Sequence, residues 1–179
     1  MRRLVDINIL DDEGLQASVV WVSLVICVLG TLVGVFLALI FPHEPISWKW
    51  FLALGAVSVV ALPVHELLHA LGFLVCTGFS ARLRFGFASG MLYTASPGTT
   101  LRRNTFCAVL LAPAVLLTAT LYLTSLLFGY PLLGWFLAVV HLAGCSGDFG
   151  YVHIIMSEPK ATLVQDTERG IALFHDDRD

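Results

Sequence analysis

Residues 48–78 read WKWFLALGAVSVVALPVHELLHALGFLVCTG, an apolar run long enough to cross a membrane, and residues 65–69 within it spell the motif H-E-x-x-H. On a helix, this motif places His65 and His69 one turn apart on the same face, where both imidazoles can bind zinc. Glu66 is then positioned to act as a general base. Ionisable residues inside a transmembrane helix are costly, which makes a functional site the default interpretation. The motif and its apolar surroundings are independent signals, and both predict a metal site inside a membrane.

The composition is typical of a membrane protein. Of the 179 residues, 58% are hydrophobic and 13% are charged, and the mean hydropathy is +0.86. A soluble domain carries about 25% charged residues, so this chain has too little polar surface to cover a globule in water. The net charge of −3 and the lack of a basic block argue against nucleic acid as a partner. We therefore expect a multi-pass protein of the cell membrane, with the lipid bilayer as its environment.

Apolar runs divide the chain into four predicted spans, because a helix needs about 20 residues to cross the bilayer. The expected spans are residues 17–41, 48–78, 104–128 and 132–156. The pattern predicts an all-α integral membrane protein with about four transmembrane helices. The expected regions are an N-terminal segment at 1–16, a four-span membrane domain at 17–156 and a C-terminal tail at 157–179.

Residues 81–96 differ from the spans and predict a short β-hairpin between the second and third helices. Polar and apolar side chains alternate along residues 80–87, SARLRFGF, and residues 88–90, ASG, are a turn signal. In the polar tail, short strands are expected at residues 161–164 and 171–174.

The distribution of basic residues predicts the orientation of the four spans. Of the ten Lys and Arg residues, only Lys49 falls in the loops on one side. The nine on the other side are Arg2, Arg3, Arg82, Arg84, Arg102, Arg103, Lys160, Arg169 and Arg178. Cytoplasmic loops carry an excess of Lys and Arg, so both termini are expected in the cytoplasm.

A catalytic zinc site needs a third protein ligand and an open position for water. Apart from Glu66, the only acid within the four spans is Asp148, and the other intramembrane histidines are His141 and His153. His69 and Asp148 lie about nine and about eight residues before the inner ends of their spans, so at about 1.5 Å per residue they share a similar depth. An aspartate in the bilayer also needs a partner, which zinc would supply. The predicted zinc ligands are His65, His69 and Asp148.

Each of these assignments has a structural alternative. Asp148 could instead be a structural or proton-relaying carboxylate, and for His141 and His153 hydrogen bonding between helices is the leading interpretation. The four cysteines show no C-x-x-C spacing and lie in apolar surroundings, which favours buried small hydrophobic residues. Cys145 is the exception to watch, because it lies three residues before Asp148.

The chemistry predicted from these residues is metal-assisted hydrolysis. Zinc lowers the pKa of its bound water towards about 7. Glu66 takes the proton as the water attacks a carbonyl carbon and delivers it to the leaving amine. Zinc and a second donor stabilise the oxyanion. His141 is a candidate for that oxyanion donor or for an outer-shell role, and backbone N–H groups are an equal alternative.

The H-E-L-L-H-A sequence at residues 65–70, the hairpin after it and the late Ser146-Gly147-Asp148 resemble the putative zincin membrane peptidases, a family similar to the site-2 proteases that cut substrates within the membrane. The resemblance implies a helical membrane core, zinc near the cytoplasmic side and an aspartate as third ligand. It assigns His65, His69 and Asp148 as ligands and Glu66 as base. Here the aspartate stands in a G-D-F-G context, whereas site-2 proteases have N-P-D-G or L-D-G.

The leading hypothesis from the sequence is a membrane-embedded zinc metalloprotease whose active site faces the cytoplasm. Its expected partner is a membrane protein or peptide in an extended form, because a peptide bond in an intact helix is shielded. The hairpin at 81–96 could present an edge strand to such a substrate. Two alternatives remain: a protein that binds or transports a metal ion, and a catalytically silent protein that binds membrane segments.

Overall fold

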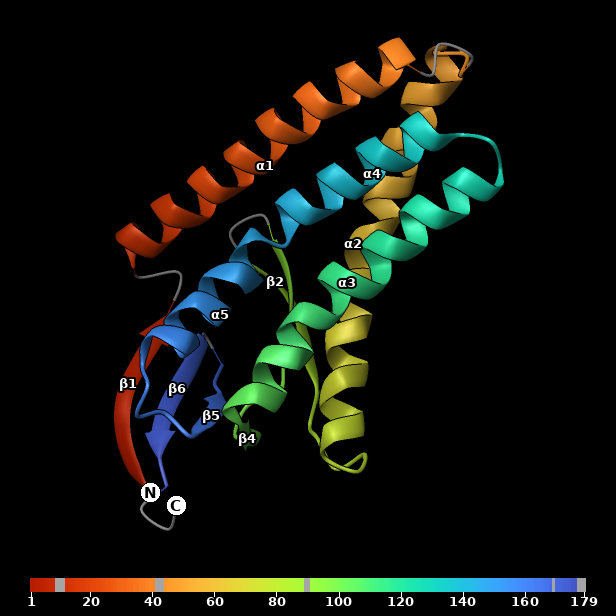
Figure 1. Ribbon diagram of the computed structural model, residues 1–179. Helices are drawn as coiled ribbons and strands as arrows, with labels where there is room; N and C mark the ends of the chain where they lie inside the picture. Colours follow the sequence, from red (N-terminus) through yellow and green to blue (C-terminus); the bar gives the residue numbers. More distant parts are fainter. Residues whose placement is uncertain (9–11, 41–43, 89–90, 169, 177–179) are drawn as a thin grey trace.

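The computed structural model of the protein describes residues 1–8, 12–40, 44–88, 91–168 and 170–176 (Figure 1). Its helices are α1 (Glu13–Ile40), α2 (Trp48–Cys76), α3 (Arg103–Leu127), α4 (Pro131–Gly144) and α5 (Ser146–Ser157). Its strands are β1 (Arg2–Asn8), β2 (Arg84–Ala88), β3 (Met91–Ala95), β4 (Thr100–Arg102), β5 (Leu163–Asp166) and β6 (Gly170–His175).

Three of the helices, α1, α2 and α3, are each long and apolar enough to cross a membrane. They match the predicted spans closely, although residue 41 at the end of the first predicted span lies outside the described residues. The fourth predicted span is two helices, because α4 and α5 meet at Cys145 with a bend of 50°. Counted as one broken span, this pair raises the number of membrane-length elements within the described residues to four. The break also sets the direction in which α5 presents its first turn.

Helix α4 lies at the centre of the helical part and contacts α1, α2 and α3 (Figure 1). Two glycines let α1 approach it closely. A Cβ atom at Gly30 would lie 2.5 Å from the side chain of Val139, and one at Gly34 would lie 2.7 Å from the ring of Phe136. Trp135 of α4 also donates a hydrogen bond from Nε1 to the carbonyl of Gly30, at 2.8 Å. Small residues at both positions are therefore required for this packing.

The outer faces of the long helices are apolar. Large exposed side chains on α1 and α2 include Val20, Trp21, Leu29, Leu32, Phe36, Leu39, Phe51, Leu52, Val59, Val60 and Leu62. A water-soluble protein rarely exposes contiguous apolar surface of this extent. The observed surface is therefore compatible with a membrane environment.

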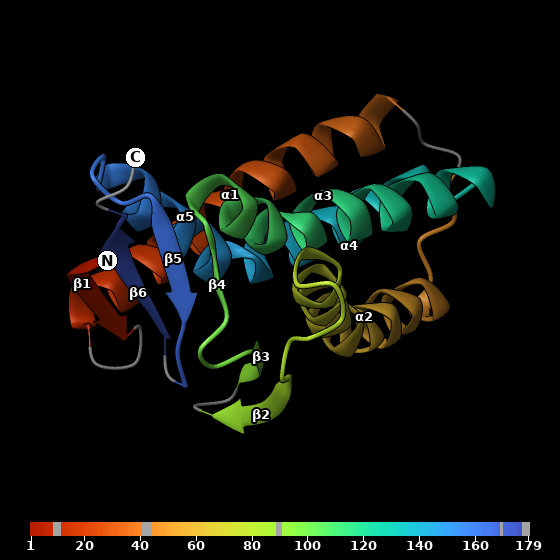
Figure 2. The ribbon, with the colours of Figure 1, turned by 90° about the horizontal axis from the view of Figure 1, so that it is seen from below.

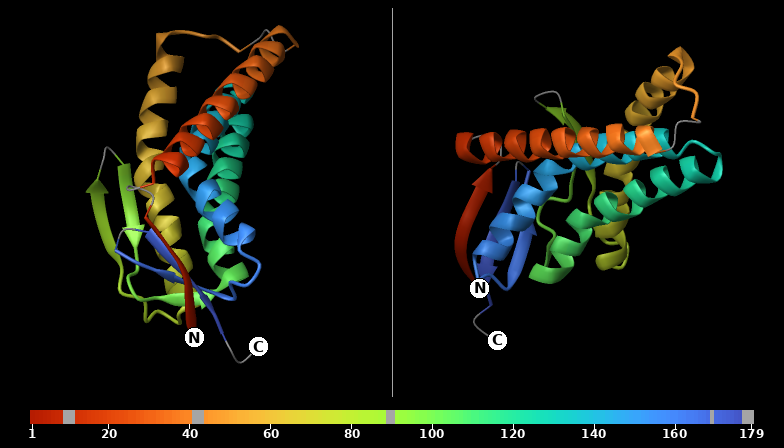
Figure 3. Two further views of the ribbon diagram at one scale, coloured as in Figure 1. Left: turned by 90° about the vertical axis from the view of Figure 1, so that its left-hand side faces the viewer. Right: turned by 45° about the horizontal axis from the view of Figure 1, so that its top comes forward.

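A four-stranded antiparallel sheet with the order β1-β6-β5-β4 lies at one end of the helices (Figure 3). The tail strands predicted at 161–164 and 171–174 correspond to β5 and β6. The all-α class, however, is incomplete, since it omits a sheet that also includes β1 and β4. The sequence interpretation treated residues 1–16 as a polar segment, whereas residues 2–8 pair with β6 along its length. The protein is mostly helical with two small sheets.

The sheet is joined to the helices by a tightly packed core. Phe106 of α3 and Ile155 of α5 are almost fully buried against Val164 and Leu173 of the sheet. Burying side chains of this size contributes about 1.5–3 kcal/mol each relative to exposure. This core fixes α3 and α5 against the sheet and so holds the lower ends of both helices in place.

The hairpin predicted at 81–96 is confirmed, with β2 and β3 paired from Arg84 opposite Ala95 to Phe87 opposite Leu92. Residues 89–90 of the predicted turn lie outside the described residues. The hairpin lies beside α2, and β3 contacts that helix (Figure 2). A hydrogen-bonded ion pair from Arg84 Nη1 to Glu168 Oε1, at 2.5 Å, links β2 to the turn after β5.

A buried carboxylate ties the segment after β3 to the larger sheet. Asp166 of β5 accepts a hydrogen bond from the backbone N–H of Ser96 with its side chain, and it exchanges backbone hydrogen bonds of 2.9 Å with Gly98 and Thr99. Burial raises the pKa of Asp166 to about 6, although hydrogen bonds from the N–H groups of Ser96 and Thr167 oppose the shift. The hairpin is thus attached to the segment around β5 at both ends, through Arg84 at its start and through Ser96 just after its last strand.

At the opposite end of the helical part, the side chain of Glu44 caps the N-terminus of α4. Glu44 accepts hydrogen bonds from the backbone N–H groups of Leu132 and Leu133, at 2.6 and 3.0 Å, in the first turn of α4. It also accepts one from Trp50 Nε1 at 2.6 Å. A carboxylate at a helix N-terminus satisfies unpaired N–H groups and complements the helix dipole.

Candidate metal centre

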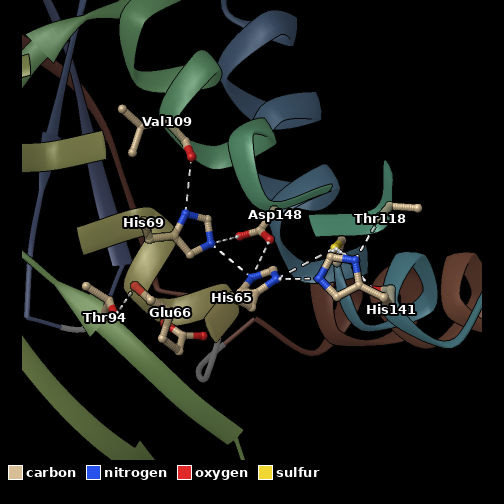
Figure 4. Close-up of polar contacts among 9 residues, drawn as sticks. His65, Glu66, His69, Thr94, Val109, Thr118, His141 and Asp148 are labelled. Atoms are coloured by element: carbon tan, nitrogen blue, oxygen red, sulfur yellow. Dashed lines mark hydrogen bonds and ion pairs between the residues drawn. The ribbon is translucent and has the colours of Figure 1, made fainter. Parts of the chain in front are cut away.

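Helix α2 presents both histidines of the motif on one face. His65 Nε2 and His69 Nε2 lie 3.0 Å apart, and the two rings meet edge to face. This is the geometry expected from residues four apart on a helix, whose side chains lie one above the other. Figure 4 shows both rings turned toward Asp148, which comes from α5.

Asp148 completes the group from the first turn of α5. Its Oδ2 lies 3.2 Å from His65 Nε2, and its Oδ1 lies 3.4 Å from His69 Nε2. The bend at Cys145 points this turn at α2, and a carboxylate in a first turn is favoured by the helix dipole. The structure therefore brings together the three residues that the sequence nominated as zinc ligands.

The donor set fits zinc. Around a tetrahedral zinc with ligand distances of about 2.0–2.2 Å, neighbouring ligand atoms lie about 3.3–3.6 Å apart. The observed separations of 3.0, 3.2 and 3.4 Å are within a few tenths of an ångström of that spacing. The side chains of His65 and Asp148 are 13% and 15% exposed, so the group is not fully enclosed. A catalytic zinc has three protein ligands and keeps its fourth position open.

Both histidines are oriented through their second nitrogen. His69 Nδ1 lies 3.2 Å from the carbonyl oxygen of Val109 on α3, which accepts its N–H and leaves Nε2 free to bind metal. His65 Nδ1 lies 3.2 Å from His141 Nε2. His141 Nδ1 in turn lies 2.8 Å from the hydroxyl of Thr118. Outer contacts of this kind fix the tautomer and ring plane of a metal-binding histidine.

His141 therefore lies behind His65 and contacts the nitrogen that points away from Asp148 (Figure 4). This geometry favours the outer-shell role over the oxyanion role that the sequence also allowed. His153 is exposed on α5, and among the described residues it belongs to neither of the two groups of closely placed metal-binding side chains.

Glu66 lies next to the two histidines on α2 and is half-buried. The hydroxyl of Thr94 on β3 donates a 3.0 Å hydrogen bond to the backbone carbonyl of Glu66. Figure 4 shows Glu66 beside Thr94, at the side of the motif that faces the hairpin. The hairpin is thereby attached to the motif at the residue expected to act as base.

Sequence reasoning missed several residues that shape this site. No sequence motif marks Thr94, Thr118 or the carbonyl of Val109. The available signal was that Thr118 is a polar residue inside an apolar run. Cys145 is fully buried, and its Sγ lies 3.8 Å from His65 Nδ1. The cysteine three residues before Asp148 in sequence thus lies beside a histidine of the motif.

Comparison with known families agrees with this arrangement. Residues 58–163 match the sequence model of the family described as "Putative zincin peptidase", which covers more than half of the chain and spans the residues from His65 to Asp148. The chain belongs to this family. Membership supports a zinc metallopeptidase, and zinc is the metal that it implies. Among curated proteins and among solved structures, no match to the chain was found.

Proposed function

We propose that this protein is a membrane-embedded zinc metalloprotease of the site-2 protease kind, which hydrolyses peptide bonds in membrane or membrane-proximal substrates. The observation that carries the proposal is the convergence of His65 Nε2, His69 Nε2 and the Asp148 carboxylate within 3.4 Å of one another, on the membrane-length helix α2 and on the bent pair α4–α5. A family of zinc peptidases that spans the same residues supports it independently.

Each side chain has a role in this proposal. His65, His69 and Asp148 would hold the zinc, which supplies Lewis acidity toward a water and a peptide carbonyl. Glu66 accepts the proton of the attacking water and passes it to the leaving amine. Val109 and His141 keep the two imidazoles in the tautomers that leave Nε2 free for metal. The surrounding apolar helices limit access of bulk water, which strengthens each electrostatic contact.

The sheet end of the molecule is proposed to face the cytoplasm. Basic residues near that end are Arg2, Arg3, Arg82, Arg84, Arg102, Arg103 and Lys160, whereas Lys49 lies at the start of α2 at the other end. Arg169 and Arg178 lie outside the described residues. The metal-binding group lies in the half of α2 nearer the sheet, so the active site would open toward the cytoplasmic side.

The hairpin β2–β3 is the proposed guide for substrate. It stands beside α2, and Thr94 fixes β3 to the motif at Glu66. An extended peptide that added to this two-stranded sheet would gain backbone hydrogen bonds next to the base. A helical substrate could not do so, because its backbone groups are already paired. Substrates with locally unwound or juxtamembrane segments are therefore expected.

The experiment that tests the function is Glu66→Gln in purified protein, with Glu158→Gln, at the residue that follows α5, as a control. Removal of a general base costs about 10²–10⁴-fold in turnover. The expected result for Glu66→Gln is loss of cleavage of a membrane-segment substrate with the zinc content unchanged from the wild-type protein. Unchanged cleavage would contradict the proposal. Lost metal flux in vesicles without any cleavage would favour a carrier, and retained biological activity would favour a silent binding protein.

A further inference from the structure

We propose that the protein has a second metal site, formed by His65 Nδ1, His141 Nε2 and Cys145 Sγ, which binds a soft or borderline cation such as Zn²⁺, Cd²⁺ or Cu⁺. This thiolate set shares His65 with the catalytic set, which is His65, His69 and Asp148. The two sets use opposite nitrogens of the same ring (Figure 4). The proposal goes beyond peptide hydrolysis and does not depend on it.

The three ligand atoms of the thiolate set are close enough to bind one ion. His65 Nδ1 lies 3.2 Å from His141 Nε2, and Cys145 Sγ lies 3.8 and 3.9 Å from these two nitrogens. With metal–nitrogen distances of about 2.0–2.1 Å, metal–sulfur distances of about 2.3 Å and angles from tetrahedral to trigonal, nitrogen pairs lie about 3.3–3.6 Å apart and nitrogen–sulfur pairs about 3.5–3.8 Å apart. Shifts of a few tenths of an ångström would satisfy all three bonds.

The fold builds this set from α2 and the end of α4, two helices that contact each other. His141 and Cys145 are four residues apart at the end of α4, so their side chains lie on one face, and His65 comes from α2. Cys145 is 0% exposed and His141 is 9% exposed. Ligands that are buried and held by packing lose little freedom when an ion binds, which favours binding.

Thr118 prepares His141 to be a ligand. Its hydroxyl lies 2.8 Å from His141 Nδ1 and can accept that N–H. The lone pair of His141 Nε2 then points at His65 and Cys145. A metal-binding histidine almost always donates its other N–H to such an acceptor, so this contact is what a metal site requires.

The chemistry of the donors selects the class of ion. Two imidazoles and one thiolate suit Cu⁺, Zn²⁺ and similar cations, whereas Mg²⁺ and Ca²⁺ prefer oxygen ligands. Without metal, the thiol of Cys145 donates to the carbonyl of His141 at 3.2 Å. Metal binding displaces the thiol proton, and it also displaces the N–H proton of His65 Nδ1 when Nε2 already holds zinc. The shared ring would then be an imidazolate that bridges two ions.

A simpler interpretation of the same contacts is that His65 Nδ1–H donates to His141 Nε2 and Cys145 only fills space. Cobalt(II) distinguishes the two, because a thiolate bound to cobalt gives an intense near-ultraviolet charge-transfer band that nitrogen and oxygen ligands do not give. The titration is performed on the full chain in detergent with Glu66→Gln as background, so that proteolysis cannot interfere.

The expected result is two equivalents of bound cobalt and a thiolate band. Cys145→Ser should abolish the band and leave one equivalent bound at the catalytic set. His69→Ala, which removes a ligand of the catalytic set alone, should keep the band. Cys76→Ser and Cys107→Ser are the matched controls, since the first residue is exposed, the second is buried, and among the described residues neither belongs to a group of metal-binding side chains; both variants should keep the band.

The proposal is overturned if the wild-type chain gives no thiolate band at two equivalents, or if the band survives in Cys145→Ser. Because Cys145→Ser replaces one atom, elution at the wild-type volume in size-exclusion chromatography verifies that the variant folds. Failure of the peptidase proposal would be a different observation, namely cleavage that is unaffected by Glu66→Gln, and it would leave the cobalt result unchanged.

Discussion

Asp148 Oδ2 lies 3.2 Å from His65 Nε2, although the two residues come from the last and the second of the long apolar segments. The contact exists because the chain breaks at Cys145 and restarts as α5, whose first turn points at α2. A continuous fourth helix would direct that turn elsewhere. The break in the helix is therefore the structural feature that assembles the proposed metal centre.

Asp148→Asn should release zinc without unfolding the protein. An amide is a much weaker zinc ligand than a carboxylate. Loss of a residue that only hydrogen-bonds to a zinc ligand lowers metal affinity about 10–100-fold, so we expect a larger fall in zinc affinity here. Metal content after dialysis against a chelator measures this. Asn104→Ala, on the first turn of α3, is the control. Full zinc retention in Asp148→Asn would remove Asp148 from the ligand set.

Thr118→Val should weaken zinc binding through His141. Loss of the hydroxyl removes the partner of His141 Nδ1 and frees the ring that holds His65, so the zinc affinity is expected to fall about 10–100-fold. Competition with a zinc indicator measures the change. Thr120→Val on the same helix is a matched control, because its hydroxyl donates to the Leu116 carbonyl of that helix. Equal affinities in the two variants would argue against the relay from Thr118 to His65.

Thr94→Val should loosen the hairpin beside the motif. The variant loses the hydrogen bond to the Glu66 carbonyl, and a typical bond of this kind contributes about 1 kcal/mol to the free energy of unfolding. Faster hydrogen exchange in β2 and β3, together with a raised KM for an extended substrate, is the expected outcome. Ser80→Ala, which removes an exposed hydroxyl outside the hairpin, should change neither. A Thr94→Val protein with wild-type exchange rates would contradict the attachment.

Asp166 should make stability fall as the pH rises from about 4 to about 6. Burial raises its pKa in the folded protein to about 6 from an ordinary 3.8, so the folded state holds the proton more tightly than the unfolded state does. The folded state is therefore favoured at low pH, and the advantage is lost across this window, by about 3 kcal/mol. Thermal unfolding from pH 4 to 7 measures it. Asp166→Asn should lack this dependence, and an unchanged slope in that variant would contradict the assignment.

The ligands could be predicted from the sequence because each one is an exception to the rule that transmembrane helices lack ionisable side chains. His65, His69 and Asp148 are ionisable residues in apolar helices, and such residues need partners. Depth along the helices then paired Asp148 with the motif. The same reasoning could not separate the roles of His141, because depth does not reveal which nitrogen of His65 it contacts.

The strands were predictable only where alternation or turn signals were clear. The hairpin at 84–95 has both, whereas β1 at Arg2–Asn8 pairs with β6, a strand at the far end of the sequence. The sequence of β1, RRLVDIN, does not alternate strictly between polar and apolar residues, and its register shifts between Arg3 and Val5, so it carries no clear strand signal. Thr94 and Thr118 were missed for a similar reason, since a single threonine in an apolar segment has many equivalent interpretations.

The most direct test of the zinc centre is an experimental structure with anomalous scattering recorded on both sides of the zinc absorption edge. The expected result is a zinc peak within bonding distance of His65 Nε2, His69 Nε2 and the Asp148 carboxylate, with the open side toward Glu66. A protein that cleaves substrate while its zinc lies elsewhere, or whose zinc is held without Asp148, would contradict the account.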